Sequence, residues 1–317
     1  MLLCYNPADE GKPVLKVDFV DFGFIDKCNN FFVNLLSQVY TVVICDKPDV
    51  VFYSDTGGSH LHRLYPCKRI FWTGESTEPD FSVCDYAMTP RQIDHPRHCR
   101  LPYYVVGCEC DAEDIIKGPD EAETVLAQNR HGCSVVISNA GRRAQYRKDF
   151  FLKLRERIPV YSGGRSFNNI GGPLPPGGQP KHEFLSRYRF NQCFENKSLP
   201  GYVTEKLVEA MWARCIPIYW GAAGIVSEFN PNSFINVHDF PSEEACLDRI
   251  AEIENNDEAY LKMLREPFFH DNRINDFYDM NRYVTFLRQV VEEDITPNAR
   301  RKPAIRLGRW KLAKRMH

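Results

Sequence analysis

Residues 188–221 read YRFNQCFENKSLPGYVTEKLVEAMWARCIPIYWG, and this stretch decides the fold class. The apolar run that ends at Phe194 predicts a strand. Pro200-Gly201 interrupts the chain, and the spacing of apolar residues then predicts a helix over 202–213. A further β-branched run at 217–220 predicts a second strand. Strand, helix and strand in this order are typical of a parallel α/β sheet.

The predicted helix separates apolar from polar side chains. Its apolar stripe is Val203, Leu207, Ala210 and Met211, and its other face carries Tyr202, Glu205, Lys206 and Glu209. One interpretation is a solvated face with an ordinary ion pair. The other starts from position: the helix follows the end of a strand, where α/β proteins bind ligands. Free N–H groups, a partial positive charge and a lysine in the first turn then favour a pyrophosphate, as in a nucleotide-sugar.

Short apolar runs alternate with helix-like stretches along the rest of the chain. The predicted strands are 41–45, 50–53, 69–72, 134–138, 159–161, 217–220 and 234–237, and the predicted helices include 29–38 and 243–253. The glycine- and proline-rich loop 163–178 is long for a compact domain, which indicates either a functional loop or a surface excursion.

The polar stretch 107–130 has weak periodicity and predicts a boundary between two domains. We expect an N-terminal domain over 1–115, against which helices near 275–296 pack back. A C-terminal domain is expected over 130–270, followed by a basic tail over 297–317.

Composition and motifs argue against several classes of function. The 317 residues carry a formal net charge of -2, so the whole molecule has no field that would recruit nucleic acid. The motifs GxGxxG, GxxxxGK[ST], HExxH, GxSxG and DxD are absent, which argues against the common NAD, ATP, zinc-protease and serine-hydrolase sites. The 12 cysteines are scattered, and we expect them to be reduced thiols. The N-terminus predicts neither a signal peptide nor a membrane span, so we expect a cytoplasmic protein.

The segment FEN followed by GYVTEKLVEAMWARCIPIYWG resembles the signature of the bacterial, Helicobacter-type α-1,3-fucosyltransferases of glycosyltransferase family 10. The similarity continues through FNPNSFINVHDF to about Glu266. The resemblance implies an α/β fold of the GT-B type, two Rossmann-like domains facing across a cleft, with an N-terminal acceptor-binding and a C-terminal GDP-fucose-binding domain. The donor contacts that it implies come from Asn196, Tyr202, Glu205 and Lys206.

A second matching patch is Ser138-Asn139, followed by Arg147 within YRKDFFLKL. In the family, a serine-asparagine segment ends a donor-domain strand and an arginine then opens the next helix near the donor phosphates. The resemblance implies this contact for Arg147, and the alternative is an arginine on a helix surface. Its competitors are Arg142, Arg143 and Arg165, and further candidates for donor or phosphate contacts are Asn139, Glu195 and Thr204.

In the N-terminal half, residues 69–86 read RIFWTGESTEPDFSVCDY. A strand that ends at Trp72 and turns through Thr73 and Gly74 places the carboxylate of Glu75 at the edge of a sheet. The family has a similar F-x-T-G-E-N-x-x-P-x-F segment whose glutamate is proposed as general base, so the resemblance implies that role for Glu75. A structural turn carboxylate is the alternative.

The chain departs from that family segment at Ser76, where many relatives have asparagine, and this bears on acceptor contacts more than on the base. Glu78 is a rival for the role of base.

The resemblance implies transfer of L-fucose from GDP-fucose to O3 of N-acetylglucosamine in N-acetyllactosamine-type glycans, with inversion, giving a Lewis X type product. A single displacement needs one base and stabilisation of the charge that leaves on GDP. Without a DxD pair to hold a metal, we expect Lys206, Arg147 and the helix N-terminus to stabilise that charge. No cofactor is expected, and a divalent metal would be at most stimulatory. Another nucleotide-sugar donor and an inactive carbohydrate-binding relative are the alternatives.

The C-terminal tail is basic: it carries Arg300, Arg301, Lys302, Arg306, Arg309, Lys311, Lys314 and Arg315. Such a tail can hold a protein against anionic lipid. We therefore expect peripheral association with the cytoplasmic face of the membrane, with a solvated tail as the alternative. The sequence does not determine the oligomeric state and is compatible with a homodimer.

Overall fold

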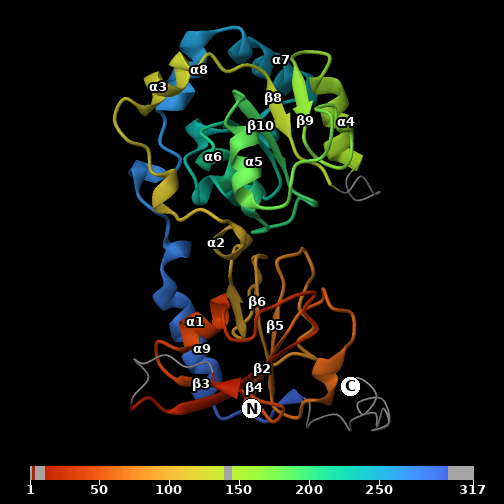
Figure 1. Cartoon of the computed structure of the whole chain (residues 1–317), viewed down its shortest axis with the longest axis vertical. Helices are drawn as coiled ribbons and strands as arrows, with labels where there is room; N and C mark the ends of the chain where they lie inside the picture. Colours follow the sequence, from red (N-terminus) through yellow and green to blue (C-terminus); the bar gives the residue numbers. More distant parts are fainter. Residues whose placement is uncertain (1, 4–10, 139–144, 299–317) are drawn as a thin grey trace. The chain divides into compact units, whose positions relative to one another are not determined.

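The computed structural model describes residues 2–3, 11–138 and 145–298. The chain forms two compact units, each built on its own sheet (Figure 1). Unit 1 comprises Met1–Thr89, Ile93–Cys99 and Met280–His317, and unit 2 comprises Pro90–Gln92 and Arg100–Asp279.

The division between the units differs from the expected boundary at 107–130. Residues 100–115, which we expected in the N-terminal domain, belong to unit 2. The physical reason is burial: Tyr104 and Ile115 are 1% and 0% exposed and belong to an apolar cluster of unit 2. Because polar residues lie between Tyr104 and Ile115, the sequence pattern does not indicate that this segment packs in unit 2.

The described part of unit 1 contains a seven-stranded sheet in the order β1-β3-β2-β4-β5-β6-β7. Its strands are β1 (Leu2–Leu3), β2 (Val14–Val20), β3 (Thr41–Ile44), β4 (Val50–Tyr53), β5 (Lys68–Trp72), β6 (Tyr86–Thr89) and β7 (His98–Arg100). Strands β3, β2, β4, β5 and β6 pair in parallel, and β1 is antiparallel to β3.

Strand β2 lies inside this sheet, although the sequence pattern does not predict it. Lys16 and Asp18 interrupt its apolar run. Asp18 is nevertheless buried, and its carboxylate accepts hydrogen bonds from the hydroxyl of Tyr65 (2.7 Å) and from Lys27 Nζ (2.5 Å). A buried carboxylate is tolerated in a strand when partners of this kind satisfy it.

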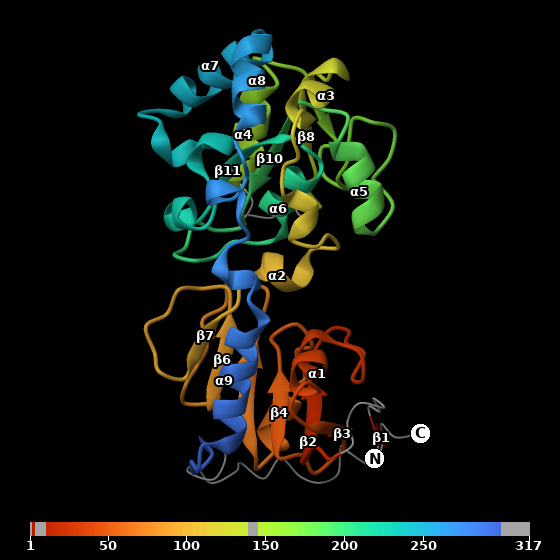
Figure 2. The same cartoon turned by 90° about the vertical axis from the view of Figure 1, so that its left-hand side faces the viewer.

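Helix α9 (Met280–Glu292) belongs to unit 1 although it is the last helix of the described chain (Figure 2). The ring of Tyr283 lies 5.9 Å from that of Phe31 on α1 (Phe31–Leu36). Lys68 Nζ donates to the backbone carbonyls of Val290 (2.7 Å) and Val291 (2.9 Å). The ammonium group thereby satisfies carbonyls that the end of the helix leaves without intrahelical partners.

Unit 2 contains a five-stranded parallel sheet in the order β12-β11-β10-β8-β9. Its strands are β8 (Cys133–Val135), β9 (Val160–Ser162), β10 (Phe190–Phe194), β11 (Ile216–Trp220) and β12 (Ile235–Asn236). Its helices are α2 (Tyr103–Gly107), α3 (Glu121–Ala127), α4 (Gln145–Leu154), α5 (Gly178–Leu185), α6 (Glu205–Trp212), α7 (Glu243–Glu254) and α8 (Asp257–Arg265).

Helices cover both faces of this sheet. Phe190 and Phe194 of β10 pack in one apolar cluster with α4, α7 and α8, whereas Cys193 packs in a second cluster with α2, α5 and α6. This is the period-2 alternation of a strand that is buried on both sides, as in doubly wound α/β proteins.

Several predicted elements occur within a few residues of their expected bounds. The strand at 50–53 coincides with β4 and the helix at 243–253 with α7. The strand predicted over 134–138 is shorter, because β8 ends at Val135. The basic tail beyond residue 298 lies outside the described residues.

Ten cysteines of the described ranges are free thiols, whereas Cys28 takes part in a disulfide. The prediction of reduced thiols is therefore wrong at Cys28, because sequence spacing does not show which cysteines the fold brings together. No helix in the described ranges is long and apolar enough to cross a membrane.

Gly164, at the start of the glycine-rich loop 163–178, packs directly on the backbone beyond β8. A Cβ atom at this position would lie 2.2 Å from the carbonyl oxygen of Ile137 and 2.5 Å from its nitrogen. Gly172, in the same loop, has no atom within 4 Å of the corresponding position. The loop therefore packs against the backbone of Ile137 at Gly164, whereas there is free space beside Gly172.

We expect Gly164→Ala to lower the free energy of unfolding by about 1–3 kcal/mol, because two backbone segments must move apart. Gly172→Ala is the matched control and should leave the stability unchanged. Thermal unfolding followed by circular dichroism measures both variants. Equal melting temperatures for the two would show that the loop does not dock on the end of β8.

Candidate functional site

The carboxyl ends of β8, β10 and β11 lie at one edge of the sheet in unit 2. Strand β10 pairs in parallel with both neighbours, so that Phe190 lies opposite Cys133 and Phe194 lies opposite Trp220. Parallel α/β sheets bind their ligands at this edge. The residues that follow β10 are therefore candidates for a ligand-binding site.

Helix α6 follows β10 and begins at Glu205, three residues later than the sequence predicts. Thr204 is the N-cap residue, with extended backbone angles. The reason is a turn before the helix, in which Gly201 has a φ of +75° and the N–H of Tyr202 donates to the carbonyl of Leu199 (3.2 Å). This left-handed conformation suits glycine and cannot belong to a right-handed helix.

The sequence predicted Tyr202 and Glu205 on one face of the helix. This prediction is wrong, because Tyr202 lies before the helix begins. Its side chain is 1% exposed. The next residue, Val203, accepts a hydrogen bond at its carbonyl from the backbone N–H of Tyr103 in α2 (3.2 Å). The segment before α6 is thus held in the interior of unit 2.

The carboxylate of Glu195 fixes the start of α6. It accepts hydrogen bonds from the backbone N–H of Thr204 (2.7 Å) and from the Thr204 hydroxyl (2.8 Å). Lys206 Nζ donates to the same hydroxyl (2.8 Å) and lies 3.6 Å from Glu195 Oε2. Burial raises the pKa of Glu195, while the charge of Lys206 and the hydrogen bonds from Thr204 act in the opposite direction. The polar atoms of Glu195 and Thr204 thus bind each other and orient Lys206.

Lys206 is held between two carboxylates. Burial acts to lower its pKa, but Glu205, 3.2 Å away, and Glu195 outweigh this effect and raise it. For Glu205, burial acts to raise the pKa, but Lys206 and Lys181 outweigh it and the pKa is lowered. Both groups therefore carry their charges at neutral pH.

A hollow beside these residues combines basic and apolar side chains. It is lined by Val136, Ile137, Arg147, Lys181, Asn191, Gln192, Phe194 and Lys206. The three basic residues come from three different helices, α4, α5 and α6. The three cations of this hollow attract negative charge, and two of them, Lys181 and Lys206, are also paired with carboxylates of α6.

Six of the eight residues that line this hollow were not predicted as site residues, and Lys181 and Gln192 are two polar ones among them. Lys181 lies in α5 and pairs with Glu209 of α6, which is buried rather than solvated. Gln192 points from β10, where its Nε2 donates to the carbonyl of Arg147 (2.9 Å), and its Oε1 has no hydrogen-bond partner. The signal that could have found Lys181 is its place in a helix directly after the glycine-rich loop.

The remaining predicted residues of this half are less informative. Asn196 follows Glu195 and is half-buried, and Arg165 is exposed in the glycine-rich loop. Asn139, Arg142 and Arg143 lie outside the described residues.

Glu75 belongs to unit 1, where it follows β5 and is exposed. Its backbone N–H donates to the hydroxyl of Thr73 (3.0 Å), and this hydroxyl donates to Asp55 Oδ1 (2.8 Å). Thr73 is 0% exposed. The loop is therefore tied to the end of the neighbouring strand β4, and Glu75 lies on its exposed part. Glu78, its rival, is also exposed.

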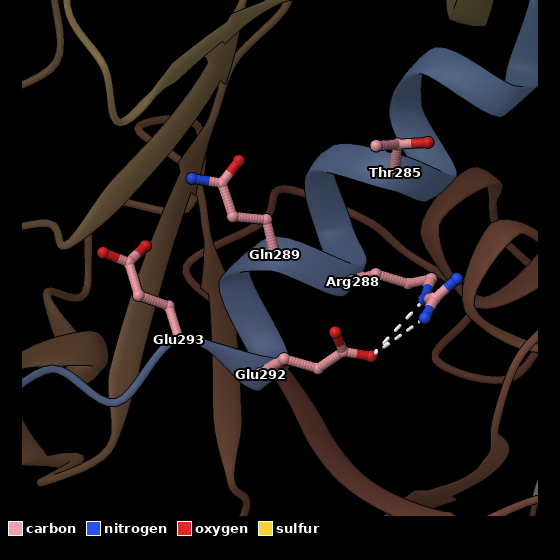
Figure 3. Close-up of a pocket in the computed structure, with 5 residues that line it drawn as sticks. All are labelled: Thr285, Arg288, Gln289, Glu292 and Glu293. Atoms are coloured by element: carbon pink, nitrogen blue, oxygen red, sulfur yellow. Dashed lines mark hydrogen bonds and ion pairs between the residues drawn. The ribbon is translucent and has the colours of Figure 1, made fainter.

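A separate hollow follows the surface of α9 in unit 1. It is lined by Thr285, Arg288, Gln289, Glu292 and Glu293 (Figure 3). Arg288 pairs with Glu292 one turn away, and Glu293 accepts a hydrogen bond from the hydroxyl of Tyr86 (2.5 Å). These charged groups have structural partners on the helix and the sheet, and the hollow contains none of the predicted site residues.

Two family models match successive parts of the chain. The family model described as "Alpha-(1,3)-fucosyltransferase FucT N-terminal domain" matches residues 17–107. The model described as "Glycosyltransferase family 10 (fucosyltransferase) C-term" matches residues 126–294.

Individual relatives show the same similarity. The chain is 31% identical to the α-(1,3)-fucosyltransferase FucT of Helicobacter pylori, over 90% of this chain and 68% of that protein. It is 33% identical to the human 4-galactosyl-N-acetylglucosaminide 3-alpha-L-fucosyltransferase over 41% of this chain and 35% of that protein. The crystal structure of an α1,3-fucosyltransferase with GDP-fucose superimposes with a TM-score of 0.72 and 29% identity, over 92% of this chain and 95% of that one. The chain therefore has the GT-B fold and belongs to glycosyltransferase family 10, the fucosyltransferases.

Proposed function

We propose that the protein transfers L-fucose from GDP-fucose to O3 of N-acetylglucosamine in N-acetyllactosamine-type glycans, with inversion at the fucose carbon. The observation that carries the donor half is the hollow of unit 2, where Arg147, Lys181 and Lys206 converge at the carboxyl edge of a parallel sheet. The similar crystal structure of an α1,3-fucosyltransferase is a complex with GDP-fucose, and this supports the same donor here.

The diphosphate of the donor would lie against these cations. Negative charge builds up on the leaving GDP as the glycosidic bond breaks, and fixed positive groups lower the energy of that state. Lys206 is oriented by Thr204 and Glu195, so little reorganisation is needed when the charge develops. The N-terminus of α6 adds a partial positive charge.

We propose two roles for the predicted donor residues. Glu205, Lys206, Arg147 and Asn196 are the residues that we propose to contact the donor. Glu195, Thr204 and Tyr202 are at most 2% exposed, and we propose that they position the contacting residues; Arg147 is also buried, at 9% exposed, but lines the hollow. Asn139 stays a candidate from the sequence alone.

Glu75 is our candidate for the general base. The acceptor hydroxyl is too weak an acid to ionise before reaction, so a carboxylate must accept its proton as the new bond forms. The exposed carboxylate on an anchored loop at the end of β5 suits this role. The leaving group needs no acid in this scheme, because the departing diphosphate is already a stable anion.

Fewer observations support the proposed acceptor than support the proposed donor. One relative is named for 3-fucosylation of 4-galactosyl-N-acetylglucosaminide, and an Arabidopsis relative, 23% identical over 63% of this chain, is named an α-(1,4)-fucosyltransferase. We propose the α-1,3 reaction because the H. pylori relative with this name matches 90% of this chain.

Two further proposals rest on the sequence alone. The basic tail would hold the enzyme at the cytoplasmic face of an anionic membrane. The reaction would proceed without a required metal, since the basic residues named above can carry the charge stabilisation.

The first test is GDP release by the purified protein from GDP-fucose, with and without N-acetyllactosamine. We expect turnover that depends on the acceptor, is absent with GDP-mannose and UDP-galactose, and persists in EDTA. Turnover of another donor would overturn the assignment of fucose, and loss of activity in EDTA would overturn metal independence. Binding of GDP-fucose without turnover of any acceptor would favour an inactive carbohydrate-binding relative.

We expect Glu75→Gln to lower turnover by about 10²–10⁴-fold, the usual contribution of a general base, with GDP affinity unchanged. Glu78→Gln is the matched control, because it removes the rival carboxylate from the same loop. Steady-state kinetics and calorimetric titration with GDP measure the two effects separately. If Glu78→Gln were the inactive variant, the role of base would pass to Glu78.

We expect Lys206→Ala to weaken GDP binding by about 10- to 100-fold, as for loss of a charge-assisted hydrogen bond of 1.5–3 kcal/mol. Lys262→Ala, an exposed lysine on α8, is the control and should bind GDP normally. Because Lys206 also neighbours the buried Glu195, Lys206→Arg serves as a second variant that keeps the charge, and it should recover part of the affinity. Wild-type affinity in Lys206→Ala would refute the phosphate role.

A further inference from the structure

Cys108 and Cys110 form a close pair of thiols in unit 2, outside the residues assigned above. They flank Glu109 in the turn that follows α2, and their sulfur atoms lie 2.9 Å apart. Cys108 is half-buried, and Cys110 is 8% exposed. A disulfide needs a separation of about 2.05 Å, so a small contraction of this turn would join the two sulfurs.

The pair lies against the elements that carry the basic hollow. Helix α2 is tied to the segment before α6 by the hydrogen bond from Tyr103 to Val203. Cys110 belongs to the same apolar cluster as Leu207 and Met211 of α6. The thiol turn and α6 are therefore parts of one packed layer.

Glu109, between the two cysteines, reaches the first residue of α5. A Cβ atom on Gly178 would lie 2.6 Å from the Glu109 carboxyl group, which leaves no free space between them. The next turn of α5 carries Lys181, which lines the hollow and pairs with Glu209 of α6. Glu109 therefore connects the thiol turn to the helix that carries a cation of the hollow.

The two thiols differ in acidity. The hydrogen bond with Cys110 lowers the pKa of Cys108, although burial opposes this effect. The same hydrogen bond, together with burial, raises the pKa of Cys110. Cys108 is also the more exposed thiol, and both features favour it as the nucleophile of the pair, because thiolates and not thiols attack disulfides.

We propose that Cys108 and Cys110 are a reversible disulfide-forming site, oxidised by a low-molecular-weight disulfide such as oxidised glutathione, and that closure of this disulfide weakens binding in the hollow beside α6. The second half of this proposal rests on the proposed function, because it treats the hollow as the site for the GDP part of the donor.

The reaction is a thiol–disulfide exchange in two steps. The Cys108 thiolate attacks one sulfur of oxidised glutathione, and one glutathione leaves as a thiolate. The Cys110 sulfur then attacks Cys108 Sγ, the second glutathione leaves, and the proton of Cys110 passes to solvent or to this leaving group. Two electrons pass from the cysteine pair to the external disulfide, so two protein thiols and one disulfide become one protein disulfide and two glutathione thiols.

The other free cysteines of the described ranges are poorer candidates. Seven of them are buried, and Cys45 is half-buried. Among the described residues, the contact between Cys108 and Cys110 is the sulfur-to-sulfur contact within hydrogen-bonding distance. Cys45 therefore provides a matched control: a half-buried thiol in unit 1 for which no sulfur contact occurs among the described residues.

The chemical test uses the full-length protein, incubated with oxidised glutathione, blocked with iodoacetamide and cleaved with trypsin. Cleavage after Arg100 and Lys117 yields a peptide, residues 101–117, whose only cysteines are Cys108 and Cys110. We expect this peptide to become lighter by two hydrogens, to resist alkylation, and to recover both alkylation sites after treatment with dithiothreitol. Cys45→Ser should behave identically, whereas Cys110→Ser should carry at most one glutathione on Cys108.

A peptide that stays fully alkylated, or that carries glutathione on both cysteines, would overturn the disulfide. The functional test is calorimetric titration of the reduced and the oxidised protein with GDP. We expect binding to be weaker by about fivefold or more after oxidation of the wild-type chain, in the range typical of coupled sites. Cys110→Ser, treated with the same oxidant, should keep the affinity of the reduced protein.

Equal affinities of the reduced and oxidised wild-type chain would overturn the coupling between the disulfide and the hollow. Absence of GDP binding to the reduced protein would count against the proposed function and, with it, against the coupling. The mass of peptide 101–117 decides the disulfide independently of either result.

Discussion

The buried carboxylate of Glu195 connects the end of β10 to the start of α6. The structure at the carboxyl edge of the sheet in unit 2 depends on this connection. A carboxylate removed from water must be hydrogen-bonded or neutralised, and here the backbone and hydroxyl of Thr204 supply two bonds while Lys206 supplies charge. The same contacts set where the helix begins and where its first lysine points. One buried charge therefore fixes both the backbone and the cation that the proposed donor would meet.

The rest of unit 2 holds this arrangement rigid from two sides. One apolar cluster joins β10 to α4, α7 and α8, and the other joins it to α2, α5 and α6. Arg147 and Lys181 thereby come from opposite faces of the sheet to the edge where Lys206 lies. Since close-packed interiors transmit small displacements, a change in the thiol turn after α2 can reach the same edge.

The sequence pattern predicts the alternation of strands and helices well where one type of residue dominates. It finds β4 and α7 within a residue or two, since both are bounded by turn residues or a cap. It misses β2, whose Asp18 is paired with Lys27 and Tyr65, side chains that lie outside the strand. It also starts α6 too early, because Tyr202 and Val203 fit a helical stripe equally well until the turn at Gly201 is known.

The sequence by itself determined the α/β class, the family resemblance and the main candidates Glu75, Arg147, Glu205 and Lys206, because motif order and residue chemistry are local properties of the chain. Only the tertiary structure decided that Glu195, Thr204 and Tyr202 are buried, and that Lys181 and Gln192 line the hollow. It also showed that residues 100–115 belong to unit 2. These facts depend on which segments pack together, and burial or pairing of a polar group is set by neighbours outside its own strand or helix.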